Sequence, residues 1–199
     1  MSRLTPTLVR LAGVAPVPWR NGGGLTRELL AWPDPQAWLL RVSVADIQAS
    51  GLFSSFPGVD RWFAVLEGGA VRLDTAGTAP KELTALDPDL HRFRGDVATH
   101  CTALAGVTRD FNLMVRRSHI RLLHQPLQKC ALLKTRATVA GLFVTHATEL
   151  RQGRGPTRPL PALTLAWWPN KERELLSLNV APTSARGWWF EVDPVPLRA

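Results

Sequence analysis

Apolar and polar residues alternate along several short stretches of this chain. From residue 40 onward, Leu40, Val42 and Val44 fall on one face of their segment, while Arg41 and Ser43 fall on the other. Alternation with a period of two and β-branched residues is typical of a half-buried strand. We therefore expect Arg41 and Ser43 to point together to the second face, which in a small barrel is either the lumen or the solvent side.

Further strand signals follow, separated by glycine-rich and proline-rich pieces. Residues 61–66 and 70–73 flank Glu67-Gly68-Gly69, a pattern that predicts a hairpin. Sixteen prolines and fifteen glycines punctuate the chain, which suits many short strands and leaves no convincing helix. Other strands are predicted over residues 97–104, 111–115, 139–146, 163–168, 175–180 and 188–192.

The strands fall into two successive groups, with a boundary between residues 118 and 128. A chain of 199 residues is long enough for one large domain or two small fused ones. We expect an all-β chain of two domains, the first over residues 1–118 and the second, more diverged, over residues 119–199. Completion of the second domain by swapped terminal strands is an open option.

The net charge of the chain alters the range of possible functions only slightly. The net charge is +8, from 20 arginines and 4 lysines against 16 acidic residues. Glu149 is the one acidic residue between Phe111 and Arg158, so this stretch is basic and a nucleic-acid-binding regulator stays open as an alternative. It is disfavoured, because the basic residues form no run and no nucleic-acid-binding motif accompanies them.

Location is inferred from three patterns. No apolar run reaches 18 residues, so no membrane span is expected, and the first residues lack the apolar core of a secretory signal. Cys101 and Cys130 fit no metal-binding spacing and are expected to be reduced, buried thiols. We therefore expect a cytoplasmic protein, for which a homodimer is an open option.

The densest polar constellation surrounds three consecutive glycines. Glycine loses the most backbone entropy on ordering, so a run of three indicates either a tight turn or a backbone that approaches a ligand closely. The residues concerned are Trp19, Asn21, Gly22, Gly23, Gly24, Thr26, Arg27 and Glu28.

Two charged pairs lie next to predicted strands. Because neighbouring strand residues point to opposite faces, neither Asp60-Arg61 nor Arg109-Asp110 can form an internal ion pair. Each charge needs another partner, either on the surface or, for an arginine facing the lumen, in a bound carboxylate. The five histidines show no paired metal-binding spacing, and no nucleophile or phosphate-loop motif occurs, so neither metal nor cofactor is expected.

Five sequence blocks, spanning roughly residues 15–117, together resemble the HutD/Ves family. They are Pro18-Trp19-Arg20-Asn21-Gly22-Gly23-Gly24-x-Thr26-Arg27-Glu28, Arg41-Val42-Ser43-Val44-Ala45, Gly51-x-Phe53-Ser54-x-Phe56-Pro57-Gly58-x-Asp60-Arg61, Phe93-x-Gly95-Asp96 and Asp110-Phe111-Asn112-Leu113-Met114-x-Arg116-Arg117.

The resemblance implies a cupin-like double β-barrel, that is, a bicupin of jelly-roll (RmlC-like) type. It also implies a protein that binds a carboxylate intermediate of histidine degradation, of the urocanate, formylglutamate or formiminoglutamate kind, and moderates that pathway. The paired histidines and glutamate of the usual cupin metal site are missing.

Within this interpretation, each candidate residue has an expected role in the first barrel. Arg27, Arg41 and Arg61 would bind the carboxylate, while Asn21, Thr26, Ser43 and Asn112 would supply neutral hydrogen bonds. Trp19, Phe53 and Phe56 would form apolar walls, Asp60 would lie beside them, and Gly22, Gly23 and Gly24 would present backbone N–H groups. A metal-free hydrolase or isomerase using Asp60 or Asp96 as a base is the alternative.

Overall fold

The structure, a computed structural model, describes residues 4–127, 131–181 and 186–195. Within these ranges the regular structure is β-strand, apart from one turn of 3-10 helix, η1 (Leu11–Gly13). The same ranges contain no helix with the length and apolar character needed to cross a membrane. The chain divides into two compact units, one from Val14 to Ile120 and one that combines the residues up to Gly13 with those from Arg121 onward.

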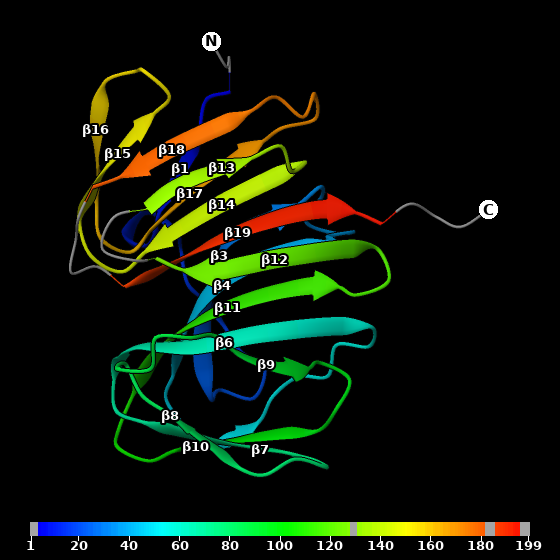
Figure 1. The fold of residues 1–199 in the computed structure, drawn as a ribbon. Helices are drawn as coiled ribbons and strands as arrows, with labels where there is room; N and C mark the ends of the chain where they lie inside the picture. Colours follow the sequence, from blue (N-terminus) through cyan, green and yellow to red (C-terminus); the bar gives the residue numbers. More distant parts are fainter. Residues whose placement is uncertain (1–3, 128–130, 182–185, 196–199) are drawn as a thin grey trace. The chain divides into compact units, whose positions relative to one another are not determined.

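The first unit, Val14–Ile120, contains two antiparallel sheets (Figure 1). Its six-stranded sheet has the order β2 (Val17–Pro18), β3 (Gly24–Trp32), β4 (Leu40–Ile47), β11 (Thr108–Arg116), β6 (Val59–Gly68) and β9 (His91–Arg94). Its four-stranded sheet has the order β5 (Gly51–Leu52), β10 (Thr99–Ala103), β7 (Val71–Thr75) and β8 (Lys81–Leu83).

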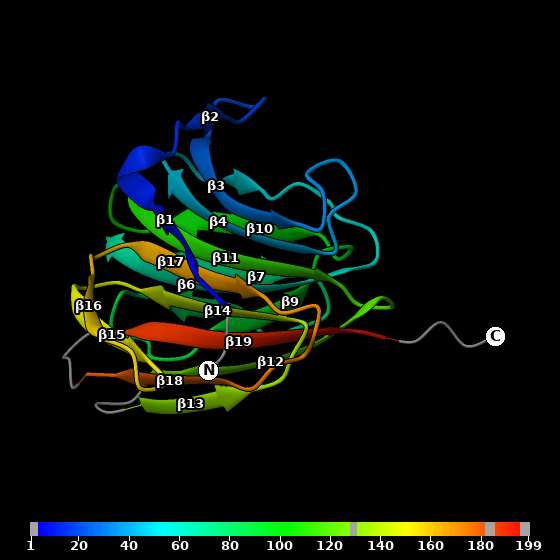
Figure 2. The ribbon, with the colours of Figure 1, turned by 90° about the horizontal axis from the view of Figure 1, so that it is seen from above.

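The second unit repeats this two-sheet arrangement (Figure 2). Its five-stranded sheet has the order β1 (Thr7–Arg10), β17 (Thr164–Pro169), β14 (Val139–Val144), β19 (Gly187–Pro194) and β12 (Ile120–Pro126). Its four-stranded sheet has the order β13 (Ala131–Thr135), β18 (Leu176–Val180), β15 (Thr148–Gln152) and β16 (Thr157–Leu160).

Each unit has its own apolar core, to which both of its sheets contribute. In the first unit, Ile47 and Phe63 of the six-stranded sheet pack with Leu73 and Cys101 of the four-stranded one. In the second unit, Trp168 and Trp189 of one sheet pack with Leu178 of the other. Side chains of alternating strand positions thus fill the space between two sheets, as expected for a sandwich or barrel.

The strands predicted from alternation are present, but the predicted hairpin over residues 61–73 is wrong. β6 and β7 lie in different sheets, and so do β10 and β11. The two connections lie side by side: the Leu104 N–H donates to the Ala70 carbonyl at 2.8 Å, and a Cβ on Gly69 would collide with the Ala105 backbone. The glycines therefore allow two crossing connections to approach closely, whereas the local pattern alone suggested a tight turn.

The N-terminal strand does not follow the expected division of the chain at residue 118, because its partner strand lies beyond that residue. β1 pairs with β17 of the second unit in an antiparallel register, Thr7 opposite Trp167 and Arg10 opposite Thr164. Cys101 is a buried free thiol, and Cys130 lies outside the described residues.

A glycine in the second unit supplies a test of its packing. Gly141 of β14 lies opposite Phe190 of β19, and a Cβ at Gly141 would meet the Phe190 ring. Because Phe190 is fully buried, it has no free space to move into, and we expect Gly141→Ala to lower the free energy of unfolding by about 1–3 kcal/mol. Chemical denaturation measures the change. Gly13→Ala is the control, since a Cβ there meets nothing within 4 Å, and equal losses for both variants would contradict this account.

Candidate functional site

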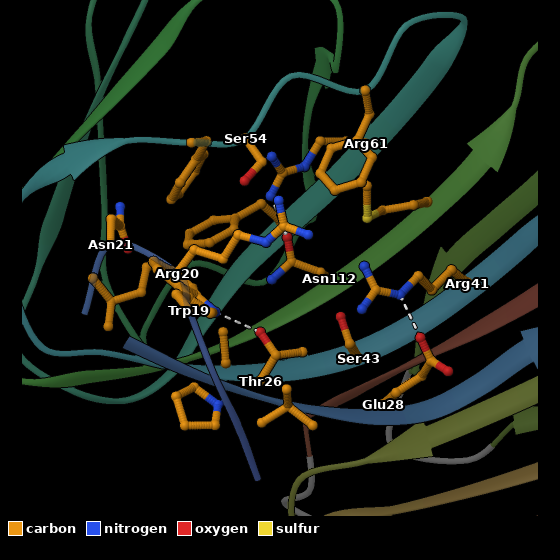
Figure 3. Close-up of a pocket in the computed structure, with 18 of the residues that line it drawn as sticks. Trp19, Arg20, Asn21, Thr26, Glu28, Arg41, Ser43, Ser54, Arg61 and Asn112 are labelled. Carbon is orange, nitrogen blue, oxygen red and sulfur yellow. Dashed lines mark hydrogen bonds and ion pairs between the residues drawn. The ribbon is translucent and has the colours of Figure 1, made fainter. Parts of the chain in front are cut away.

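A cavity of about 780 Å³ opens within the first unit (Figure 3). Strands β3, β4, β6 and β11 of the six-stranded sheet supply one wall, and the segments around residues 17–21 and 52–56 supply the rest. This volume lies in the range of small-molecule sites. The lining residues are Val17, Pro18, Trp19, Arg20, Asn21, Thr26, Glu28, Arg41, Ser43, Ala45, Ile47, Leu52, Phe53, Ser54, Phe56, Arg61, Phe63, Asn112 and Met114.

Arg61 of β6 is the central charged group of this cavity. Its residue is 7% exposed, and burial lowers the pKa of its guanidinium to about 10, with the nearby Arg41 charge acting in the same direction. Its Nη2 donates to Asn112 Oδ1 at 2.8 Å, whereas its buried Nε has no hydrogen-bond partner. Among the described residues no carboxylate pairs with Arg61. A buried cation of this kind is costly unless something compensates for its lost hydration.

Aromatic rings give part of that compensation. The Arg61 Cζ lies 4.7 Å from the Phe53 ring centroid and 4.9 Å from that of Phe93. Those two centroids are 6.2 Å apart, and the centroid of a third ring, that of Phe56, lies 5.8 Å from the same Cζ. A cation over aromatic faces is stabilised by the ring quadrupoles.

Strand register places a second arginine level with the first. Arg41 of β4 and Arg61 of β6 both lie opposite Met114 of β11, which runs between them. The next level toward the interior holds Ser43 and Asn112, which also face the cavity. Arg41 differs from Arg61 in one respect, because its Nε donates to Glu28 Oε2 at 2.6 Å.

The three glycines shape the loop that carries Trp19, and they do not line the cavity. The Gly22 N–H donates to the Trp19 carbonyl at 3.0 Å, and the Gly23 N–H to Asn21 Oδ1 at 3.1 Å. These donors are used within the loop, so the expected presentation of backbone N–H groups to a ligand is wrong for Gly22 and Gly23. Gly24 is required for space, since a Cβ would lie 2.5 Å from the Asp46 carbonyl oxygen and 3.3 Å from the Trp19 ring.

The Trp19 side chain is itself fixed. Its Nε1 donates to Thr26 Oγ1 at 2.7 Å, and its backbone N–H donates to the Gly24 carbonyl at 2.9 Å. The loop thus holds a half-buried aromatic wall against β3 at the cavity mouth.

The expected role of Arg27 in carboxylate binding required it to face the cavity, but Arg27 faces away from it. Along β3, Thr26 and Glu28 point into the cavity, and strand alternation turns Arg27 to the opposite face. There Arg27 Nη1 pairs with Asp46 Oδ2 at 2.6 Å, and Arg109 Nε pairs with Asp46 Oδ1 at 2.8 Å. Burial disfavours the charged form of Asp46, but the hydrogen bonds from the two arginines outweigh it and lower its pKa.

Asp60 is likewise turned away from the cavity, as its position next to Arg61 requires. It accepts from Arg92 at 2.7 Å and from Arg117 at 2.9 Å, and Arg117 also bonds Asp96. Hydrogen bonds from Arg117 and Arg94 lower the pKa of Asp96 far below its usual range. Neither carboxylate lines the cavity, so this arrangement does not support the alternative in which Asp60 or Asp96 acts as a base on a ligand held there.

Asp110 is a second buried ionisable group, and no cationic side chain forms an ion pair with it among the described residues. It is 0% exposed, accepts one hydrogen bond from Thr108 Oγ1 at 2.8 Å, and leaves its Oδ1 without a partner. Burial raises its pKa to about 8. Burial also raises the pKa of the Cys101 thiol to about 12, which makes it a poor nucleophile. No cluster of three metal-binding side chains occurs in the part of the chain that the structure describes.

The structure thus gathers nine of the fourteen expected residues around one cavity and places Gly22, Gly23, Gly24, Arg27 and Asp60 outside its lining. Arg20 and Glu28 also line the cavity, although neither was among the expected ligand-binding residues. Alternation along β3 could have identified Glu28, which is two positions after Thr26. No strand pattern covers Arg20, which lies in the loop after β2.

A smaller hollow of about 360 Å³ lies in the second unit, beside the turn between β15 and β16. Its cationic lining residues, Arg154 and Arg158, are both exposed. It therefore lacks the buried, unpaired charge that distinguishes the cavity of the first unit.

The glycine loop yields a paired test. Gly24→Ala should lower the free energy of unfolding by about 1–3 kcal/mol, because the added Cβ meets backbone and an anchored ring. Gly23→Ala is the matched control, since its Cβ would meet only the Asn21 side chain at 3.4 Å or more. Denaturant unfolding of both variants, with tryptophan fluorescence as the probe, distinguishes them. Equal stability of the two variants would show that Gly24 is not needed for space.

The raised pKa of Asp110 predicts a pH dependence of stability. Between the ordinary value of 3.8 and about 8, the folded protein keeps this proton while the unfolded chain releases it. The free energy of unfolding should therefore fall as pH rises through this window, by about 2 kcal/mol or more in total. The side chain of Asp110→Asn stays uncharged at every pH. The melting temperature of this variant should therefore exceed that of the unaltered protein, by a difference that grows from about pH 4 to pH 8.

Thermal unfolding over a pH series measures this difference, with Asp34→Asn, an exposed carboxylate, as the control for loss of one acid group. A difference between Asp110→Asn and the unaltered protein that stays constant over the series would contradict a buried, protonated Asp110.

Comparison with known proteins gives the context of this site. A "Protein Ves" from Citrobacter koseri is 37% identical over 105 residues, which cover 52% of this chain and 54% of that protein. An "Uncharacterized 21.2 kDa protein in hutC 3'region" from Pseudomonas putida is 35% identical over 153 residues, which cover 74% of this chain and 78% of that protein.

Solved structures agree with these relatives. HutD from Pseudomonas fluorescens SBW25, solved in a formate condition, matches 96% of this chain and 100% of its own with a TM-score of 0.85 at 25% identity. A cupin 2 conserved barrel domain protein from Leptotrichia buccalis matches 92% of this chain and 97% of its own with a TM-score of 0.56 at 10% identity, a likeness of fold alone. The expected all-β, cupin-like fold is therefore confirmed.

The sequence model of the HutD family matches residues 12–185, which include every block that carried the resemblance. The chain belongs to the HutD family.

Proposed function

We propose that this protein binds a small carboxylate-bearing molecule in the cavity of its first unit. The observation that carries the proposal is Arg61, a buried guanidinium that faces a cavity and has no carboxylate partner among the described residues. A bound carboxylate would supply the missing counter-charge and could accept hydrogen bonds from a planar guanidinium in a defined orientation.

The surroundings of Arg61 suit such a ligand. Asn112 lies beside the guanidinium and fixes its Nη2, while Ser43 faces the cavity from the neighbouring strand. Phe53, Phe56 and Trp19 give apolar walls against which the body of a small molecule can pack. Small-molecule sites commonly combine mostly apolar walls with a few placed polar groups of this kind.

The family context narrows the choice of ligand. The Pseudomonas putida relative is named for its place in the hutC 3' region, and the Pseudomonas fluorescens structure is named HutD. The proposal is therefore that the ligand is a carboxylate intermediate of histidine degradation, such as urocanate, formylglutamate or formiminoglutamate. Ligand occupancy would moderate flux through the pathway. A cytoplasmic location is part of the proposal, and the free, buried thiol of Cys101 is compatible with it.

Thermal unfolding with these intermediates and with unrelated carboxylates tests the proposal. A ligand that binds the native state at about 100 times its Kd should add about 2.7 kcal/mol to the free energy of unfolding. We expect a saturable rise in melting temperature with one intermediate. Arg61→Met should abolish this rise, because it removes the charge that the carboxylate pairs with.

Arg61→Met has a second expected effect that separates binding from folding. Without ligand, its free energy of unfolding should be about 1 kcal/mol higher than that of the unaltered protein, since a buried cation without a carboxylate partner is replaced by an apolar chain of similar length. Arg72→Met, at an exposed arginine of β7, controls for the lost charge and should keep the ligand response. A ligand response that survives in Arg61→Met would refute the assignment.

A further inference from the structure

The N-terminal strand β1 forms one edge of the five-stranded sheet in the second unit. It pairs with β17, and no other strand in the described part of the chain pairs with it. The Leu11 N–H, just after the strand, donates to the Leu163 carbonyl at 2.9 Å. Because hydrogen-bonded positions alternate along an antiparallel ladder, the backbone groups of Val9 then point toward β17, and those of Leu8 and Arg10 point away from it. β1 thus presents backbone donors and acceptors at an open edge.

The hollow of about 360 Å³ in the second unit lies along this edge. Leu8 lines it from β1, and Leu150 and Leu160 line it from β15 and β16. Leu8 lies opposite Ala166, a residue of the apolar core, so the Leu8 side chain is on the core face of its sheet, yet it is 47% exposed. The hollow is therefore an open gap between two edge strands, β1 and β16, which belong to different sheets.

The two walls of this gap are held in place by the side chain of Gln152. Its Nε2 donates to the Leu4 carbonyl at 2.6 Å, and its Oε1 accepts from Trp168 Nε1 at 3.1 Å. Gln152 belongs to β15 and lines the hollow, while Trp168 is fully buried in the core. The segment before β1 is thus tied to the opposite sheet, which lowers the ordering cost of binding in the gap.

The charges around the gap have one sign. Arg154 and Arg158 are the charged residues that line it, and Arg10 is exposed on the open edge. Arg158 lies opposite Leu150, so both share the inner face of the hairpin. None of these three arginines forms an ion pair with a carboxylate among the described residues. The neighbouring Glu149 precedes Leu150 and therefore lies on the other face of the hairpin.

We propose that this edge binds an acidic segment of a partner protein, which adds a strand to β1. An apolar side chain of the segment fills the gap beside Leu8, and acidic side chains two positions away, on the same face, pair with the arginines of the rim. In strand addition, main-chain hydrogen bonds give affinity and pockets for alternate side chains give specificity. The inference is independent of ligand binding in the first unit.

A second copy of this chain is a poorer occupant of the same edge. Its own β1 would bring another Arg10, Arg154 and Arg158 to a place that already carries three positive charges. Like charges brought together oppose association. The charge of the edge therefore favours a partner of opposite sign.

Short peptides of matched length test the proposal. The peptide Glu-Thr-Leu-Thr-Glu, acetylated and amidated at its ends, places leucine between two glutamates on one face of an extended strand. In titrations at low salt, we expect the unaltered protein to bind it at least about tenfold more tightly than peptides with serine for leucine or glutamine for both glutamates. Equal binding of the serine peptide would overturn the role of the gap and indicate a general anion-binding surface, nucleic acid included. Equal binding of the glutamine peptide would overturn the role of charge.

Methylation of single backbone nitrogens tests strand addition itself. Successive N–H groups of a strand point to opposite edges, so the leucine and the preceding threonine of the peptide direct theirs to different sides. A methyl group on the nitrogen that faces β1 should weaken binding at least about tenfold, and one on the other nitrogen should change it by about twofold or less. Equal effects at the two positions would contradict strand addition.

Amide hydrogen exchange locates the binding edge in the protein. The amide protons of Leu8 and Arg10 should exchange at least about tenfold more slowly when the unaltered protein is saturated with the acidic peptide. That of Val9 should change little, because it already faces β17. NMR spectroscopy of the labelled protein measures each rate, and unchanged rates at Leu8 and Arg10 would overturn the assignment to β1.

A pair of variants tests the charged rim. Arg158→Gln should weaken binding of the acidic peptide about threefold or more, because one ion pair is lost. Arg121→Gln is the control of equal charge change, since Arg121 lies on β12 at the other edge of the five-stranded sheet and its side chain is 70% exposed. Equal affinities of the two variants would overturn the role of Arg158.

Discussion

A positive charge buried without a carboxylate partner dominates the first unit. Arg61 loses most of its hydration and keeps one side-chain hydrogen bond, to Asn112, together with the aromatic faces of Phe53 and Phe93. In a low-dielectric interior these contacts do not equal an ion pair. The protein therefore keeps a buried charged group whose lost hydration its own contacts replace only in part.

The antiparallel register of three strands turns that single charge into a site. β4, β11 and β6 lie side by side, so one level carries Arg41, Met114 and Arg61, and the next carries Ser43, Asn112 and Phe63. A shift of one residue in any of these strands would exchange the cavity face for the opposite face. On that opposite face, Leu40, Val42 and Val44 are fully buried, which stabilises the register and with it the position of the charges.

Much of this arrangement was predictable from the sequence, because strand alternation is a local property. It placed Arg41 and Ser43 on one face and separated Asp60 from Arg61 correctly. Along β3 the same alternation turns Thr26 and Glu28 to the cavity and Arg27 away from it, but the run of glycines at the start of this strand carries no side chains that mark its two faces. The predicted hairpin at Gly68-Gly69 is wrong for another reason. A Cβ at either glycine would collide with the backbone of Ala105 or Val107, which lie about 40 residues further along the chain. No local sequence pattern reveals a neighbour at that distance.

The pairing of β1 with β17 has a consequence for synthesis on the ribosome. All strands of the unit Val14–Ile120 have emerged before the partner of Thr7–Arg10, residues 164–169, has been translated. At elongation rates of about 5–20 residues per second, several seconds pass between the synthesis of the first strand and that of its partner. During that interval the first strand lacks its native partner, and an unpaired strand is a template on which another chain can pair.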